Sequence, residues 1–148
     1  MLVLGPADAG KSSLCRVLLA AATAAGRTVA VLDTDLGQKT VGPPTCVTLG
    51  RLGAGGGLEM AGLAFAGETH PVRAWGHVAD GVERLAAGAG ADLVVADSDG
   101  LLAGPGRRLK VALIRAFGPD LLLALGDDPA LAAVLADHAV VPALKVAG

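Results

Sequence analysis

Aromatic side chains are nearly absent from this sequence of 148 residues, which contains two Phe, one Trp and no Tyr. Domains that bind single-stranded nucleic acid along a sheet stack successive bases on several exposed aromatic rings. A chain this poor in aromatic residues cannot build such a platform, so that class of nucleic-acid-binding domain is excluded.

Charge of either sign is also scarce. Charged residues make up 18% of the chain, and the formal net charge is −2. This balance excludes the broad basic surface that duplex DNA requires. Hydrophobic residues make up 53% of the chain, which excludes a disordered tail and predicts a buried core. The length fits one domain, residues 1–148.

Long apolar runs and paired cysteines are missing as well. The runs at 111–117 and 121–125 are too short to cross a membrane, and no basic segment follows Met1 as it would in a signal peptide. Cys15 and Cys46 lack the spacing of metal or redox sites, which favours reduced thiols in a cytoplasmic protein.

Strand-like and helix-like segments alternate along the chain. Strands are expected at 1–4, 28–32, 58–66, 93–96, 120–125 and 139–146, and a short one at 46–49 inside a Gly/Pro-rich connection at 37–57. Helices are expected at 11–25, 72–87, 107–117 and 129–137. Continuously apolar strands between helices predict an α/β fold, a doubly wound, mostly parallel sheet with helices on both faces. Trp75, on a predicted helix, is expected to pack in the core, and the alternative is that it serves as a stacking platform.

Residues 5–12 read G-P-A-D-A-G-K-S, which matches the phosphate-loop pattern G-x-x-x-x-G-K-[ST] between a strand and a helix. Glycines let the backbone approach an anion, and N–H groups at the helix start point at phosphate oxygens. Lys11 supplies charge to the β- and γ-phosphates, and Ser12 is placed to bind Mg²⁺. Asp8 is expected to face solvent, because a carboxylate repels phosphate. The nucleotide-binding residues are therefore Gly5, Pro6, Ala7, Asp8, Ala9, Gly10, Lys11, Ser12 and Ser13.

A second informative segment, V-A-V-L-D-T-D-L-G-Q, covers residues 29–38. Asp33 and Asp35 follow a predicted strand, and ligands of open parallel sheets bind beyond the carboxyl ends of the strands. Residues two apart in an extended stretch point the same way, so the pair is expected to face the γ-phosphate. One carboxylate would hold Mg²⁺, and the other would lie near the attacking group. The alternative is a polar loop in which the aspartates cap a turn.

Segments 5–19 and 29–44 together resemble the polynucleotide 5'-hydroxyl kinase family, the P-loop kinases of RNA processing that include the cleavage-factor subunit and nucleolar ribosomal-RNA-processing kinases. Segments 65–71 and 94–106 match later family motifs in order and rough spacing. The resemblance extends from the first strand to about residue 126.

The resemblance implies a P-loop NTPase fold and an enzyme that transfers the γ-phosphoryl group of ATP to the 5'-hydroxyl end of RNA or DNA. Carried over by position, Lys11 stabilises the transferring group, Ser12 and Asp33 hold Mg²⁺, and Asp35 is the candidate base. Such chemistry depends on positioning and charge neutralisation, which few residues can supply. The residues implied to bind the nucleic-acid end are Gln38, Ser98, Gly100, Arg107 and Arg108.

The sequence departs from this family in a turn and in a lid. Leu101 stands where the family has a base-stacking Trp, and Ser98 where it has Thr. The family's arginine-bearing lid has no counterpart at 140–146, so a partner protein or further domains are expected to supply it. The cations Arg107, Arg108 and Lys110 are the candidate substitutes, and the alternative places them on a solvated helical turn.

These departures leave a second function open, an ATP-binding regulatory or assembly module of the P-loop class without phosphotransfer. A third is a dimeric P-loop NTPase of the partner-switching type. ATP is favoured over GTP, because residues 125–128 lack the Asn and Lys of guanine-reading loops. Asp97, at the end of another predicted strand, is either a water-mediated partner of Mg²⁺ or a turn carboxylate.

Overall fold

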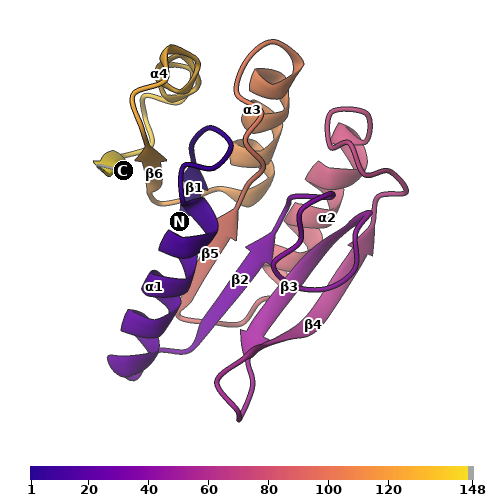
Figure 1. The fold of residues 1–148 in the computed structure, drawn as a ribbon, viewed down its shortest axis with the longest axis vertical. Coiled ribbons are helices and arrows are strands. Elements are labelled where there is room, and N and C mark those ends of the chain that lie inside the picture. Colours follow the sequence, from indigo (N-terminus) through magenta and orange to yellow (C-terminus); the bar gives the residue numbers. More distant parts are fainter. Residues whose placement is uncertain (147–148) are drawn as a thin grey trace.

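A mixed β-sheet lies at the centre of the computed structural model, which describes residues 1–146 (Figure 1). Its strands are β1 (Leu2–Leu4), β2 (Val29–Asp33), β3 (Cys46–Leu52), β4 (Leu58–Phe65), β5 (Leu93–Asp97), β6 (Leu122–Leu125) and β7 (Ala143–Val146). The helices are α1 (Lys11–Ala24), α2 (Trp75–Ala87), α3 (Pro105–Phe117) and α4 (Pro129–Ala136). Each strand and helix expected from the sequence is therefore present.

The strand order in this sheet is β4-β3-β2-β5-β1-β6-β7. Strands β2, β5, β1, β6 and β7 run parallel to one another. The β3–β4 hairpin extends the sheet at one edge, where β3 pairs antiparallel with both β2 and β4. Leu2, Val3 and Leu4 of the central β1 are all fully buried, as expected for a parallel strand with helices on both faces. The predicted α/β fold with a mostly parallel sheet is confirmed.

Helices pack on both faces of the sheet. Cys15 and Leu19 of α1 share one core cluster with Val3, whereas Leu2 and Leu4 share the other with residues of α2, α3 and α4. Alternate residues of β1 thus belong to different cores, because successive side chains of a strand point to opposite faces. This arrangement leaves the carboxyl ends of β1, β2 and β5 at one edge, where the loops to the helices begin (Figure 1).

The Gly-rich connection at 37–57 contains more strand than the sequence predicts. Strand β3 continues past residue 49 to Leu52, and it pairs with both β2 and β4. Gly50 lies opposite Val31, and a Cβ on Gly50 would lie 3.0 Å from the Val31 side chain. Cross-strand pairing therefore outweighs the low strand preference of glycine at this position.

The prediction that Trp75 packs in the core is wrong, because 59% of its surface is exposed. Val78 and Val82, which follow it on the same helical stripe, are buried in the core. Trp75 is the first residue of α2, where that stripe continues beyond the core into a surface cavity beside Pro105.

Cys15 and Cys46 are both free and buried. Burial raises the pKa of the Cys15 thiol well above its ordinary value. Within residues 1–146, none of the helices has the length and hydrophobicity needed to cross a membrane.

Candidate active site

The phosphate loop joins the end of β1 to the start of α1. Gly10 precedes the helix in a left-handed conformation, with φ 87°, and no side chain caps the first turn. The N–H groups of that turn are therefore free to bind an anion. A Cβ on Gly5 would lie only 2.9 Å from the carbonyl oxygen of Leu125, so glycine is required where the loop passes β6.

Lys11 lies along the phosphate loop. Its Nζ donates a hydrogen bond of 2.7 Å to the carbonyl oxygen of Pro6, and only 8% of the residue is exposed. This contact holds the ammonium group at the loop, where a phosphate would be bound. Asp8 is exposed, in agreement with the expected solvent-facing carboxylate.

A cavity of about 550 Å³ lies beside this loop. Four segments line it: the phosphate loop, the segment after β2, the loop before α2 and the turn after β5. Its lining residues are Ala7, Asp8, Gly10, Lys11, Ser12, Ser13, Asp35, Gln38, His70, Pro71, Asp97, Ser98, Asp99, Gly100 and Leu101. The fold therefore brings most predicted site residues together. The predicted residues that do not line the cavity are Gly5, Pro6 and Ala9 of the phosphate loop, and Asp33, Arg107 and Arg108.

Asp33 is buried and its carboxylate is bonded within its own loop. The Oδ1 atom is 3.0 Å from Lys39 Nζ and accepts the N–H of Asp35, while Oδ2 accepts the N–H groups of Thr40 and Val41. These contacts wrap residues 34–41 around the carboxylate. The turn role that the sequence left open is thus present in the structure.

Asp35 lies at the cavity and is held by the same loop. Its Oδ1 atom accepts hydrogen bonds of 2.9 Å from the N–H groups of both Gly37 and Gln38. This turn, in which an Asp side chain binds the backbone ahead of it, fixes the carboxylate next to Gln38 at the cavity wall.

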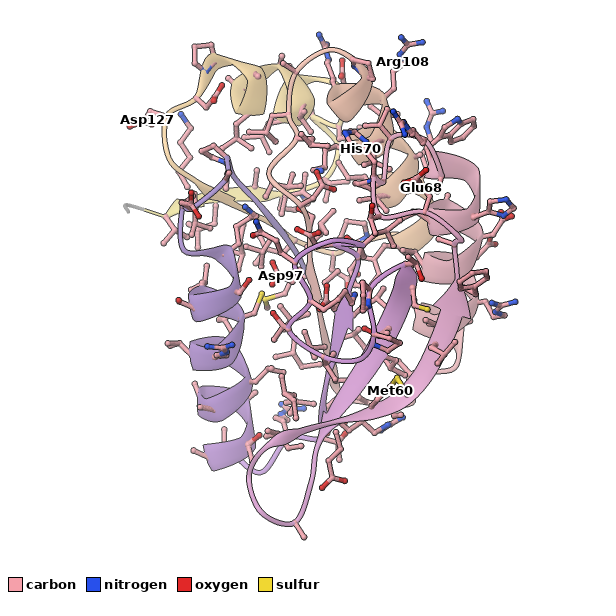
Figure 2. The ribbon with its side chains drawn as sticks, turned by 45° about the vertical axis from the view of Figure 1, so that its right-hand side comes forward. Met60, Glu68, His70, Asp97, Arg108 and Asp127 are labelled. Atoms are coloured by element: carbon pink, nitrogen blue, oxygen red, sulfur yellow. The ribbon has the colours of Figure 1, made fainter. Side chains whose placement is uncertain are left out.

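Asp97 ends β5 and points into the same cavity, between α1 and the ends of the strands (Figure 2). The residue is 5% exposed, and within residues 1–146 its buried Oδ1 has no hydrogen-bond partner. Burial raises the pKa of the Asp97 carboxyl; the nearby Ser12 hydroxyl opposes this shift, and the charge of Asp33 adds to it.

An unpaired buried oxygen beside a hydroxyl is a suitable set of donors for Mg²⁺, which keeps several waters and needs few protein ligands. The described residues contain no cluster of three or more His, Cys, Asp and Glu side chains that could hold a metal alone. Ser12 and Asp97 therefore fit Mg²⁺ better than Asp33 does, because phosphate and water can complete the coordination.

The turn after β5 rests on a buried ion pair that the sequence did not predict. Lys110 Nζ lies 2.7 Å from Asp99 Oδ1, and Lys110 is completely buried, so its expected placement on a solvated turn or in the crevice is wrong. Burial lowers the pKa of Lys110, and Asp99 partly offsets that shift. The Ser98 hydroxyl donates to the Val3 carbonyl, which ties the same turn to β1.

The two arginines at the start of α3 have separate environments. Arg107 forms two hydrogen bonds of 2.7 Å with Asp137 at the end of α4, and it does not line the cavity. Arg108 lines a neighbouring cavity together with Trp75. The structure thus does not bring Arg107 to the phosphate loop.

The loop before α2 contributes side chains that were not among the site residues predicted from the sequence. His70 and Pro71 line the cavity, and Glu68 accepts hydrogen bonds from the N–H groups of Thr69 and His70 (Figure 2). The only sequence signal for this loop is the loosely matched segment 65–71, because no spacing rule connects it to residues 5–12.

Gly100 is expected to be essential for the shape of the phosphate loop. A Cβ at this position would lie 2.4 Å from the backbone nitrogen of Ala7, and backbone cannot move aside as a side chain can. We expect Gly100→Ala to weaken nucleotide binding about tenfold or more, and to cost about 1–3 kcal/mol of stability. Titration calorimetry with Mg-ATP and thermal unfolding measure the two effects.

Gly57→Ala is the matched control for Gly100→Ala. A Cβ on Gly57 meets nothing within 4 Å, so this variant should bind nucleotide and unfold like the parent protein. Unchanged nucleotide binding in Gly100→Ala would contradict the tight contact between the two loops.

The sequence matches one family model over nearly its whole length. That family is described as mRNA cleavage and polyadenylation factor CLP1 P-loop, and the match covers residues 5–146. The match begins at the first glycine of the phosphate loop and includes every residue that lines the cavity.

Similar curated proteins include archaeal kinases. The chain is 31% identical over 141 residues to a polyribonucleotide 5'-hydroxyl-kinase of Pyrococcus horikoshii, and 30% identical over 141 residues to that of Methanocaldococcus jannaschii. Both matches cover 91% of this chain and 39% of the relative. A Thermococcus kodakarensis kinase of the same name is 36% identical over 131 residues, covering 82% of this chain and 36% of the relative.

A solved structure of the wild-type Clp1p–Pcf11p complex has the same fold, with a TM-score of 0.72. The match covers 99% of this chain and 42% of that chain, at 13% sequence identity. The chain therefore spans about 40% of the length of these longer proteins.

Proposed function

Because this chain belongs to the family of mRNA cleavage and polyadenylation factor CLP1 P-loop domains, we propose that it binds ATP and transfers the γ-phosphoryl group to a 5'-hydroxyl end of RNA. One observation carries the proposal: a single cavity joins a complete phosphate loop to the carboxylates of Asp35 and Asp97. The relatives named polyribonucleotide 5'-hydroxyl-kinases favour RNA over DNA, and they favour transfer over a binding module without activity.

The phosphate loop supplies the nucleotide site. N–H groups of residues 7–13 would bind the phosphates at the positive end of α1. The Lys11 ammonium group, now bonded to the Pro6 carbonyl, would turn to the β- and γ-phosphate oxygens and stabilise their charge during transfer.

Ser12 and Asp97 would hold Mg²⁺ between the nucleotide and β5. Bound Mg²⁺ neutralises charge on the β- and γ-phosphates. Asp33 would support this site indirectly, because its contacts with Lys39 and with the backbone fix the loop that carries Asp35.

Asp35 is the proposed base for the acceptor. The 5'-hydroxyl oxygen attacks the γ-phosphorus, the bond from that phosphorus to the β,γ-bridging oxygen breaks, and ADP leaves. The hydroxyl proton passes to the Asp35 carboxylate, whose orientation is fixed by the Gly37 and Gln38 amides. The Gln38 side chain would position the attacking end.

Transfer of label tests this function directly. The protein is incubated with Mg²⁺, γ-labelled ATP and an RNA oligonucleotide that carries a 5'-hydroxyl group, and labelled RNA is the expected product. The same RNA with a 5'-phosphate is the matched control and should stay unlabelled. Tight binding of Mg-ATP without label on any RNA or DNA end would overturn the proposed transfer and support the regulatory module.

Paired Asn substitutions separate the roles of Asp97 and Asp33. Asp97→Asn should lower activity about 10- to 100-fold, as losses at metal sites typically do. It should leave thermal stability unchanged or raised, because it removes a buried charge with an unpaired oxygen. Asp33→Asn should instead lower stability by about 3–5 kcal/mol, because Lys39 loses its buried partner.

Thermal unfolding and the dependence of the rate on Mg²⁺ concentration measure these effects. If a stable Asp33→Asn variant requires more Mg²⁺ and Asp97→Asn requires the normal concentration, then Asp33, and not Asp97, holds the metal.

A further inference from the structure

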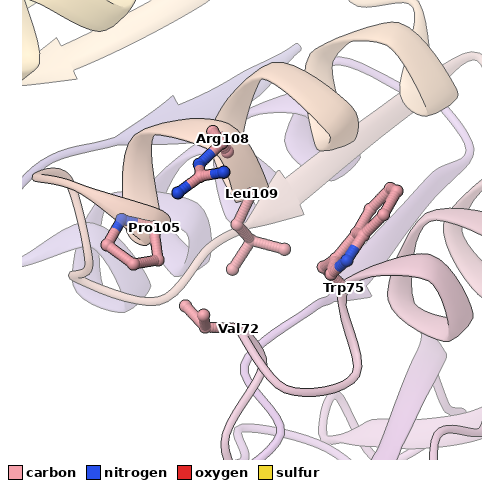
Figure 3. Close-up of a pocket in the computed structure, with 5 residues that line it drawn as sticks. All are labelled: Val72, Trp75, Pro105, Arg108 and Leu109. Atoms are coloured by element: carbon pink, nitrogen blue, oxygen red, sulfur yellow. The ribbon is translucent and has the colours of Figure 1, made fainter.

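A second cavity, of about 350 Å³, lies between the amino-terminal ends of α2 and α3 (Figure 3). It is separate from the cavity at the phosphate loop, since the two have no lining residue in common. Its lining residues are Val72, Trp75, Pro105, Arg108 and Leu109.

The lining of this cavity combines an aromatic plane with a positive charge. Trp75 is 59% exposed, and Arg108 is an exposed guanidinium that forms no ion pair within residues 1–146. Val72 and Leu109 add apolar surface beside the indole (Figure 3). A nucleobase matches this lining, because its flat face stacks on indole and its attached phosphate attracts an arginine.

The cavity adjoins the phosphate cavity along two chain segments. Pro71 lines the phosphate cavity and the next residue, Val72, lines the second one; consecutive Cα atoms are only about 3.8 Å apart. On the other side, Leu101 lines the phosphate cavity and the same short turn leads to Pro105. The two cavities therefore adjoin along both segments, so that an RNA end can extend from the phosphate cavity into the second one.

We propose that this cavity binds the 5'-terminal nucleobase of the acceptor RNA, with the base stacked on Trp75 and the following phosphate bound by Arg108. This inference rests on the proposed function, since it concerns the acceptor of the same reaction. It also assigns a role to an exposed tryptophan, in a chain whose Leu101 offers no aromatic face in the adjoining cavity.

Fluorescence of Trp75 tests the binding step without any need for catalysis, because it is the only tryptophan in the chain. A short 5'-hydroxyl RNA should quench this fluorescence, whereas the same RNA with an abasic 5'-terminal nucleotide should need about a 5- to 150-fold higher concentration, as expected for the loss of one stacked base. Mg-ATP alone should leave the fluorescence unchanged; quenching by ATP alone would place adenine in the cavity and overturn the proposal.

Kinetics of substitutions test the same contact. Trp75→Ala should raise the KM for the RNA by a similar factor with little change in kcat, and Trp75→Phe should restore most of the loss. Phe65→Ala is the matched control, because Phe65 is a 71% exposed aromatic on β4 outside both cavities, and its KM should match that of the parent protein. Arg108→Gln should raise KM and reduce its dependence on salt.

The outcomes distinguish this inference from the function on which it rests. Efficient phosphorylation with equal KM for normal and abasic RNA would overturn the base site and leave the kinase intact. Base-dependent quenching without labelled product would overturn the kinase and leave the base site intact.

Discussion

Lys11→Met is expected to lower the rate of phosphate transfer about 100- to 1,000-fold, the usual cost of losing one preorganised charge-stabilising group. The ammonium group of Lys11 is held at the phosphate loop by its hydrogen bond to the Pro6 carbonyl, and the cavity beside it offers no other lysine or arginine. Methionine keeps the length and apolar stem of lysine but supplies no charge to the γ-phosphoryl group. Single-turnover label transfer at saturating Mg-ATP measures the chemical step directly.

Arg16→Met is the matched control for this substitution. Arg16 is an exposed cation on α1 that does not line the phosphate cavity, so its loss should leave the rate unchanged. A Lys11→Met variant that folds normally and keeps the parental rate would show that the charge at the phosphate loop is not needed. Transfer would then have to rely on another part of the protein.

Lys110→Met is expected to cause a large loss of stability, of the same size as that expected for Asp33→Asn. Lys110 is completely buried and lies 2.7 Å from Asp99, so its removal leaves a buried carboxylate with the N–H of Leu101 as its remaining donor. Breaking a buried pair on one side typically costs about 3–5 kcal/mol. For a chain of this size the thermal midpoint should fall by about 6–20 °C, which thermal unfolding followed by circular dichroism measures.

Two controls show whether burial explains this effect. Arg107→Met breaks the exposed pair with Asp137 on the same helix and should leave the thermal midpoint close to that of the parent protein. The double variant Lys110→Met with Asp99→Asn removes both charges and should be more stable than Lys110→Met alone. A double variant as unstable as the sum of the two single ones would contradict a direct pair.

The order of strands and helices could be predicted from local pattern, because apolar runs and glycine or proline breaks are properties of neighbouring residues. Local pattern does not predict features that depend on contacts between segments distant in the sequence. Strand β3 extends to Leu52 because β2 and β4 pair with it, and no short-range pattern in a Gly-rich segment reports such pairing. Trp75 is exposed because the first turn of α2 extends beyond the core. The apolar stripe of the helix does not indicate where along the helix the core ends.

The different environments of Asp33 and Asp35 could not be predicted from local sequence either. Their spacing predicts that both side chains face the γ-phosphate. Backbone bonds and Lys39 instead occupy Asp33, while Asp35 reaches the cavity. Asp97 reaches the same cavity because β5 pairs in register with β2, which aligns Asp97 with Asp33 across the sheet. That register is set by packing and hydrogen bonds across more than 60 residues of sequence.

The sequence by itself determined the phosphate loop, because glycine, lysine and serine at fixed short spacing already specify a backbone turn, a charge and a hydroxyl. It also determined the alternation of strands and helices, and hence the α/β class. Only the tertiary structure decided which carboxylates share the cavity and that Arg107 pairs with Asp137 outside it. It also decided that Trp75 and Arg108 line the same adjoining cavity. The reason is physical: local spacing governs the conformation of a short segment, whereas burial and charge pairing depend on contacts between segments far apart in the chain.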